Sequence, residues 1–168
     1  MLVLFLIIAG ILLRLAPHAP NFTPVAAIAL FGGVYLRKKY ALIVPLALMI
    51  ISDLVIGLHD VFIFTWGGFA LVTLIGLWLK NRKSVLRTAS ASLVSSFIFY
   101  IFTNFGVWMM GYYPRNFKGL IDCYIMALPF LRSFTLATLF YAAVFFGIYE
   151  LAAHFVKDTK LSKVLLTN

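Results

Sequence analysis

Polar side chains interrupt the apolar runs of this sequence at a few places, and each of them is a group that can do chemistry. His18 and Asn21 stand between the first two runs, and Asp53 lies near the end of the third. A strongly polar or charged group at the centre of a membrane span costs about 2.5–3.5 kcal/mol on insertion scales, so it needs a partner, a cavity or an interface. These residues are therefore the first candidates for a functional site.

A second polar group lies within the fifth apolar run. Tyr100, Asn104 and Trp108 are spaced four residues apart, so one face of a helix presents all three. Such a stripe is typical of a ligand site, and equally of an interhelical hydrogen bond with ordinary aromatic packing. With residues from the adjoining connections, the candidate ligand-binding residues are His18, Asn21, Asp53, His59, Asn104, Trp108, Tyr112 and Cys123.

Two acidic residues can also be explained by contacts with nearby parts of the protein. Asp53 is four residues before Gly57, about 6 Å below the end of its helix at 1.5 Å per residue. There it either faces a ligand, caps the helix, or pairs with Arg14 or Arg132. Glu150 and His154 are spaced four apart and form either a local helix contact or a proton relay.

The sequence predicts neither a metal centre nor an enzyme. No pair among its histidines, its one cysteine and its acids has a ligand spacing such as His-x-x-x-His. A metal carried by the ligand, with a histidine or Cys123 as axial partner, stays open. No serine stands in a Gly-x-Ser-x-Gly elbow, and the serines of "SASLVSS" suit close helix packing. We therefore assign no catalytic residue and no cofactor.

The elements that position these residues must be membrane helices. The chain is 64% hydrophobic and 11% charged, with a mean hydropathy of +1.05, against about 45–50% apolar and 25% charged residues in soluble domains. Lipid cannot satisfy free backbone polar groups, and the apolar runs do not alternate as barrel strands do. The sequence predicts an all-α integral membrane protein, with one transmembrane domain over residues 1–168.

Six apolar runs predict six transmembrane helices in a compact bundle. They cover residues 1–16, 24–36, 41–57, 61–79, 88–111 and 133–155, approximately. A short surface helix over 119–128, ended by Pro129, is expected between the fifth and sixth spans. Ala29 and Gly33, four apart in the second run, predict the close approach of a neighbouring backbone.

The basic residues predict the orientation. With a cytoplasmic N-terminus and six spans, ten of the fourteen Lys and Arg residues fall on the inner side, where positive charge collects. The four on the other side are Arg14, Arg115, Lys118 and Arg132. This predicts a multi-pass protein of the bacterial inner membrane with both termini cytoplasmic. It also explains the net charge of +9 without nucleic-acid binding.

This architecture resembles the substrate-binding S components of energy-coupling factor (ECF) vitamin transporters, which are small six-helix proteins with an outward, loop-covered pocket. The stretches "PHAPNFTPVAAIALFGG", "SDLVIGLHD" and "TNFGVWMMGYYP" are similar to those of an uncharacterised bacterial membrane family. S components dock on a coupling subunit through an Ala-x-x-x-Ala face of the first helix. Here Leu13 follows Ala9 at that spacing, so the motif is absent. Coupling to such a subunit with its ATPases and solitary uptake both stay open.

The resemblance and the outer polar residues together give an expectation of function. We expect a membrane uptake protein that binds a small vitamin-like or cofactor-precursor solute in an outward-facing pocket and delivers it inward. The alternative is a non-transporting accessory subunit of a larger membrane complex, in which the polar cluster meets a protein neighbour.

Overall fold

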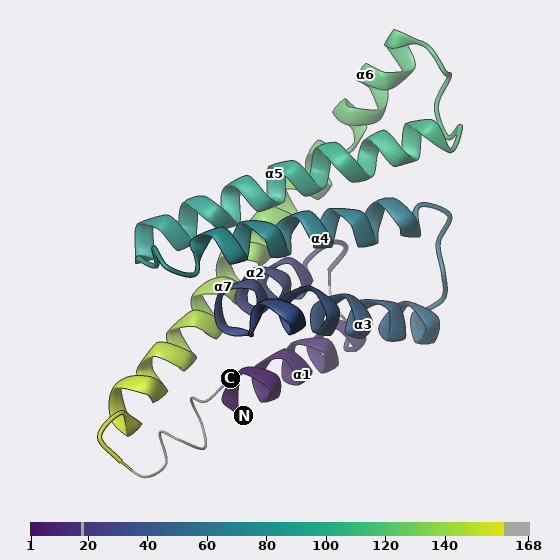
Figure 1. The fold of residues 1–168 in the computed structure, drawn as a ribbon. Helices are drawn as coiled ribbons and strands as arrows, with labels where there is room; N and C mark the ends of the chain where they lie inside the picture. Colours follow the sequence, from purple (N-terminus) through teal and green to yellow (C-terminus); the bar gives the residue numbers. More distant parts are fainter. Residues whose placement is uncertain (18, 160–168) are drawn as a thin grey trace.

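The computed structural model describes residues 1–17 and 19–159, and within those residues the chain is entirely helical (Figure 1). Its helices are α1 (Leu2–Leu15), α2 (Val25–Tyr35), α3 (Lys38–Ile56), α4 (Phe62–Leu79), α5 (Val85–Met109), α6 (Phe117–Met126) and α7 (Leu128–Val156). Each predicted span and the predicted surface helix has a counterpart. The all-helical class is therefore confirmed for the described residues.

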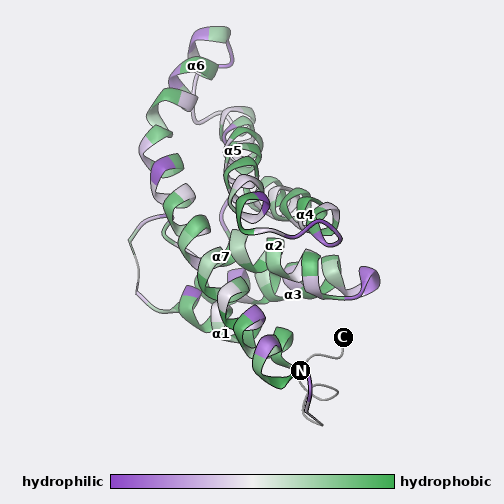
Figure 2. Ribbon diagram, turned by 90° about the vertical axis from the view of Figure 1, so that its left-hand side faces the viewer, coloured by the Kyte–Doolittle hydropathy of each residue, from purple (hydrophilic) through white to green (hydrophobic). Residues whose placement is uncertain are grey.

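Four of these helices, α3, α4, α5 and α7, are long and apolar enough to cross a membrane. The other two apolar helices, α1 and α2, have 14 and 11 residues, or about 21 and 16 Å at 1.5 Å per residue. These lengths are less than the ~30 Å of a bilayer core. Hydrophobic residues cover most of the helices, whereas hydrophilic ones gather at helix ends and connections (Figure 2). These features are those of a membrane protein.

The short helix α2 forms the centre of the bundle. All of its residues are buried, and it contacts α1, α3, α4, α5 and α7. Its closest approach is to α4, where a Cβ added to Gly33 would lie 2.5 Å from the Thr73 carbonyl oxygen, and one added to Gly76 would lie 2.4 Å from that of Leu30. The predicted close approach at Gly33 is confirmed, and Gly76 is its partner.

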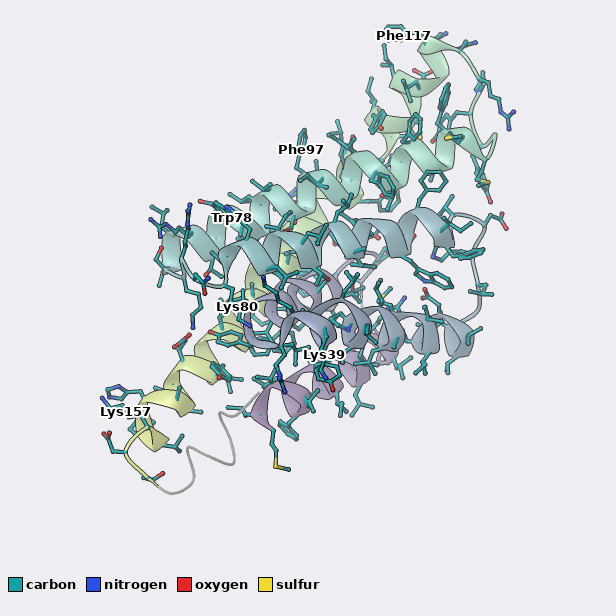
Figure 3. All side chains as sticks on the ribbon, in the orientation of Figure 1. Lys39, Trp78, Lys80, Phe97, Phe117 and Lys157 are labelled. Carbon is teal, nitrogen blue, oxygen red and sulfur yellow. The ribbon has the colours of Figure 1, made fainter. Side chains whose placement is uncertain are left out.

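The bundle has two chemically different ends. At the basic end, Lys80 Nζ donates to the Leu36 carbonyl at 2.7 Å, and Lys83 Nζ lies 2.8 Å from Glu150 Oε1. These contacts bring together the α2–α3 turn, the α4–α5 turn and the last part of α7. Figure 3 shows Lys80 and Lys157 on the side of the molecule away from Phe117 in α6. The opposite end, which we call the loop end, carries the connecting residues 19–24, 57–61 and 110–116 (Figure 1).

Pro129 was expected to end the surface helix, and that prediction is wrong. The helix α6 ends at Met126, and Pro129 stands in the first turn of α7, which begins at Leu128 rather than 133. Proline is tolerated there because the first backbone N–H groups of a helix have no intrahelical acceptor. At its start α6 is capped by Asn116, whose side-chain oxygen accepts from Gly119 N at 2.8 Å.

Candidate functional site

The residues predicted to bind a ligand do not form one cluster. His18 lies outside the described residues. Asp53 belongs to a polar cluster of α1, α3 and α4, whereas Asn21 and Asn104 line one pocket beside α5 and α7. The remaining four residues are elsewhere at the loop end. They are His59, exposed in the 57–61 connection, and Trp108, Tyr112 and Cys123 around α6.

Asp53 is buried and fully engaged by its neighbours. Arg14 Nη2 lies 2.5 Å from Asp53 Oδ1, and Trp66 Nε1 donates to Asp53 Oδ2 at 2.7 Å. The other arm of the guanidinium donates to the Ser52 hydroxyl, whose own proton goes to the Met49 carbonyl at 2.8 Å. Of the two arginines considered from the sequence, Arg14 is the partner. We call Arg14, Ser52, Asp53 and Trp66 the Asp53 cluster.

The geometry of the Asp53 cluster is that of a structural tie. Asp53 is 1% exposed, and both of its carboxylate oxygens accept charge-assisted hydrogen bonds, which are the stronger kind. The bonds join the end of α1 and the start of α4 to α3. Trp66 was not among the predicted residues. Its indole N–H was the available signal, because a buried tryptophan usually finds an acceptor.

Asn104 lines a pocket of about 130 Å³ between α5 and the start of α7. We call this hollow the Asn104 pocket. Its lining residues are Asn21, Phe99, Tyr100, Thr103, Asn104, Ala127, Phe130, Leu131 and Phe134. The rings of Phe99 and Phe134 stack with centroids 4.5 Å apart, at an interplanar angle of 17°. The wall is thus largely apolar and aromatic, with amide groups from two separate segments.

The two amides of the Asn104 pocket are held differently. Asn104 Nδ2 donates to the Tyr100 carbonyl at 2.8 Å, and its side-chain oxygen accepts no hydrogen bond from the described residues. Asn21 has φ 59°, in the left-handed region that asparagine adopts more readily than most residues. Its loop is held to α7 because Ser133 Oγ donates to the Pro20 carbonyl at 2.9 Å.

The remaining predicted residues surround the connection between α5 and α6. Trp108 Nε1 donates to the Pro114 carbonyl at 3.1 Å, and the Tyr112 hydroxyl donates to Asp60 Oδ2. That bond to a carboxylate raises the pKa of the Tyr112 phenol above its usual value. Asp60 and Tyr112 border an open hollow of about 530 Å³.

Cys123 packs against the backbone of α5 at Asn104. Its thiol contacts the backbone carbonyl of Asn104, with Sγ 3.4 Å from the oxygen, and the residue is 2% exposed. Burial raises the pKa of the Cys123 thiol, so the nucleophilic thiolate is disfavoured. Cys123 therefore joins α6 to α5 at Asn104 and is not itself a lining residue of the pocket. No group of three or more His, Cys, Asp and Glu residues that could hold a metal occurs among residues 1–17 and 19–159.

At the basic end, Glu150 has different partners from the predicted one. The sequence suggested a contact with His154, but the Tyr35 hydroxyl and Lys83 Nζ both bond to Glu150 Oε1. Lys83 also lies over the Tyr35 ring, 4.5 Å from its centroid. The carboxylate is drawn toward α2 and the α4–α5 turn because these supply a cation and a hydroxyl donor. Sequence spacing along one helix could not reveal either partner.

Comparison with known proteins gives a family and no function. No curated protein and no solved structure matches the chain. The model of one family of unknown function, DUF6580, matches residues 1–161. The match covers nearly the whole sequence, including every helix described above, and so the chain belongs to the DUF6580 family.

Proposed function

We propose that this chain is a membrane uptake protein that binds a small vitamin-like or cofactor-precursor solute in an outward-facing pocket and delivers it inward. The Asn104 pocket is the binding site in this proposal. Asn21 and Asn104 hydrogen-bond the polar edge of the solute, and the side chains of Phe99, Tyr100 and Phe134 contact its ring. Small-molecule sites commonly combine apolar walls with a few polar groups in this way.

One observation carries the proposal. Asn21 and Asn104 come from segments far apart in the sequence and line the same hollow, and the Asn104 side-chain oxygen has no protein donor among the described residues. An amide normally uses its hydrogen-bonding capacity, so an acceptor that has no protein donor, on a residue that lines a hollow, favours a ligand there.

The size of the pocket narrows the class of solute. Its volume of about 130 Å³ is below the roughly 300–1,000 Å³ typical of pockets for drug-sized ligands. A single-ring precursor fits this volume better than a complete nucleotide-like cofactor. The exposed positions of Asn21 and Phe130 supply the entrance.

The orientation in this proposal follows the distribution of charge. The basic end faces the cytoplasm of a bacterial inner membrane, because cytoplasmic connections collect Lys and Arg, and both termini are cytoplasmic. The loop end then faces outward and presents the pocket. Inward delivery requires the stacked Phe99 and Phe134 rings to separate, either by tilting of α7 or through a partner such as an ECF-type coupling subunit.

The test is retention of a solute by the purified chain. Small molecules that remain bound after gentle purification are identified by mass spectrometry, and a vitamin panel is screened by thermal shift. A true solute at 100 times its Kd should add about 2.7 kcal/mol of stability. Asn104→Leu and Asn21→Gly should abolish the shift. Glycine is chosen at position 21 because it keeps the left-handed backbone while it removes the amide.

Asn81→Leu is the matched control, since Asn81 is exposed in the α4–α5 turn at the basic end. It should leave retention unchanged. If both pocket variants retain the solute as well as the parent does, the site is wrong. If the panel has no effect and a second protein co-purifies in fixed stoichiometry, the accessory-subunit alternative replaces the uptake proposal.

A further inference from the structure

A larger hollow lies between the start of α5 and the second half of α7. We call it the Gly147 groove; its volume is about 550 Å³. Seven of the twelve residues that line it are small, namely Ser84, Thr88, Ala89, Ser92, Ala142, Ala143 and Gly147. A Cβ added to Gly147 would meet no atom within 4 Å. The groove is thus open space that the chain's own packing leaves unfilled.

The charged groups of the groove are confined to one of its ends. Lys83 and Glu150 pair there at the surface, with side chains 36% and 54% exposed. Farther along, the walls are apolar apart from Thr88 and from Ser92, whose Oγ donates to the Thr88 carbonyl at 2.9 Å. From Ser84 to Ser92 the groove follows α5 for about 12 Å at 1.5 Å per residue. It therefore suits a molecule with a polar head and an apolar tail.

The charge around this mouth is strongly positive. The α4–α5 turn and the first turn of α5 carry Lys80, Arg82, Lys83 and Arg87, and Glu150 is the one acid that lines the groove. Glu150 is paired with Lys83, whereas no acidic side chain of the described residues pairs with Arg82 or Arg87. The first backbone N–H groups of α5 add partial positive charge at the same place.

We propose that the Gly147 groove binds one acyl chain of an anionic phospholipid, whose phosphate lies at Arg82 and Arg87. The side chains of Val85 and Leu86, next to the mouth, are 90% and 78% exposed, as expected for residues that face lipid. An apolar groove alone does not select a lipid, because the chain is already in an apolar medium. The negative charge of the headgroup therefore selects the lipid, and the groove fixes the position of its acyl chain.

The experiment is native mass spectrometry of the full chain in mild detergent, mixed with equimolar dioleoyl phosphatidylglycerol and dioleoyl phosphatidylcholine. We expect about tenfold or greater preference for phosphatidylglycerol, as two basic side chains near a membrane surface provide. The double variant Arg82→Gln/Arg87→Gln should bring the preference below about twofold. Glycerol phosphate, which has the headgroup chemistry without chains, should not displace the lipid.

Gly147→Leu places a side chain in the groove at a position where an added Cβ meets no atom within 4 Å, and it should remove the retained lipid, whereas Ala47→Leu on the exposed face of α3 should not. Unchanged thermal stability of Gly147→Leu verifies folding. Equal retention of the two lipids, lipid that survives Gly147→Leu, displacement by glycerol phosphate, or a stoichiometric protein partner lost in Gly147→Leu would overturn the proposal. Solute retention at the Asn104 pocket is measured in the same variants and should not change. Failure of the lipid-site proposal can therefore be distinguished from failure of the uptake proposal.

Discussion

The Asp53 cluster and the Asn104 pocket both place polar side chains on long apolar helices toward the loop end. They differ in how completely the hydrogen bonds of those side chains are formed within the protein. Both oxygens of Asp53 have donors from Arg14 and Trp66. The Asn104 side-chain oxygen accepts no hydrogen bond from the described residues, and the residue lines a pocket. A polar residue in a membrane helix therefore indicates a ligand only where its hydrogen bonds are incomplete and a cavity adjoins it.

Removing one member of the Asp53 cluster should have the largest effect on stability. Asp53→Leu leaves the Arg14 guanidinium and the Trp66 N–H without their acceptor, and loss of one partner of a buried pair costs about 3–5 kcal/mol. The measurement is the free energy of unfolding in detergent. The double variant Arg14→Met/Asp53→Leu should recover most of the loss, because it leaves no unpaired charge. Equal losses in the single and double variants would contradict a structural ion pair.

Trp66→Phe tests the second oxygen of Asp53. It keeps an aromatic ring but removes the N–H that donates at 2.7 Å, so we expect a loss of about 1.5–3 kcal/mol, as for hydrogen bonds to charged groups. Trp78→Phe is the matched control, because Trp78 is 61% exposed on the same helix. It should change the unfolding free energy by less than about 0.5 kcal/mol. Similar losses in both variants would mean that ring size, and not the N–H, is responsible.

Asn104→Leu should separate binding from stability. The amide donates one neutral hydrogen bond to a helix carbonyl, which is worth about 0.5–1.5 kcal/mol net. The variant should therefore unfold within about 1.5 kcal/mol of the parent while it loses the retained solute. Unfolding measurements and mass spectrometry on one preparation check both. A loss as large as that of Asp53→Leu would place Asn104 with the structural residues.

The bond between Tyr112 and Asp60 should have the smallest effect, because both groups are exposed. The Asp60 carboxylate raises the pKa of the Tyr112 phenol. A group with a raised pKa in the folded state stabilises it below the unfolded pKa of about 10, and this contribution is lost as pH rises through the folded pKa. Ultraviolet titration of tyrosinate, as the difference between the parent and Tyr112→Phe, measures the shift. Asp60→Asn should lower that pKa toward 10, and no change would remove Asp60 as its cause.

Helix positions could be predicted from the sequence largely because lipid permits few alternatives. Long apolar runs bounded by charges must be helices, and the predicted and observed ends of the spans agree within a few residues, except at the start of α7. There Pro129 has two opposite uses, since the same ring that ends one helix also fits the first turn of the next. The residue alone does not distinguish them.

The candidate site could be predicted only in part, because its geometry depends on contacts between segments far apart in the chain. Asn21 and Asn104 were both identified from their polarity, and the structure places them in one pocket. Asp53 was grouped with them since it also lies toward the loop end. Two residues share a site only if their helix faces are turned toward the same part of the bundle. The spacing of residues along one helix gives no information about that.

The burial of α2 has a consequence for how the protein is made. An 11-residue helix enclosed by five others gains its stability from neighbours rather than from the bilayer, and α7, one of its walls, is synthesised after the other helices described. The centre of the bundle therefore stays incomplete until α7 has been synthesised. Chains truncated before Leu128 should accordingly be degraded in membranes that retain the 168-residue chain. Stable accumulation of such fragments would show that α2 does not need α7 for its stability.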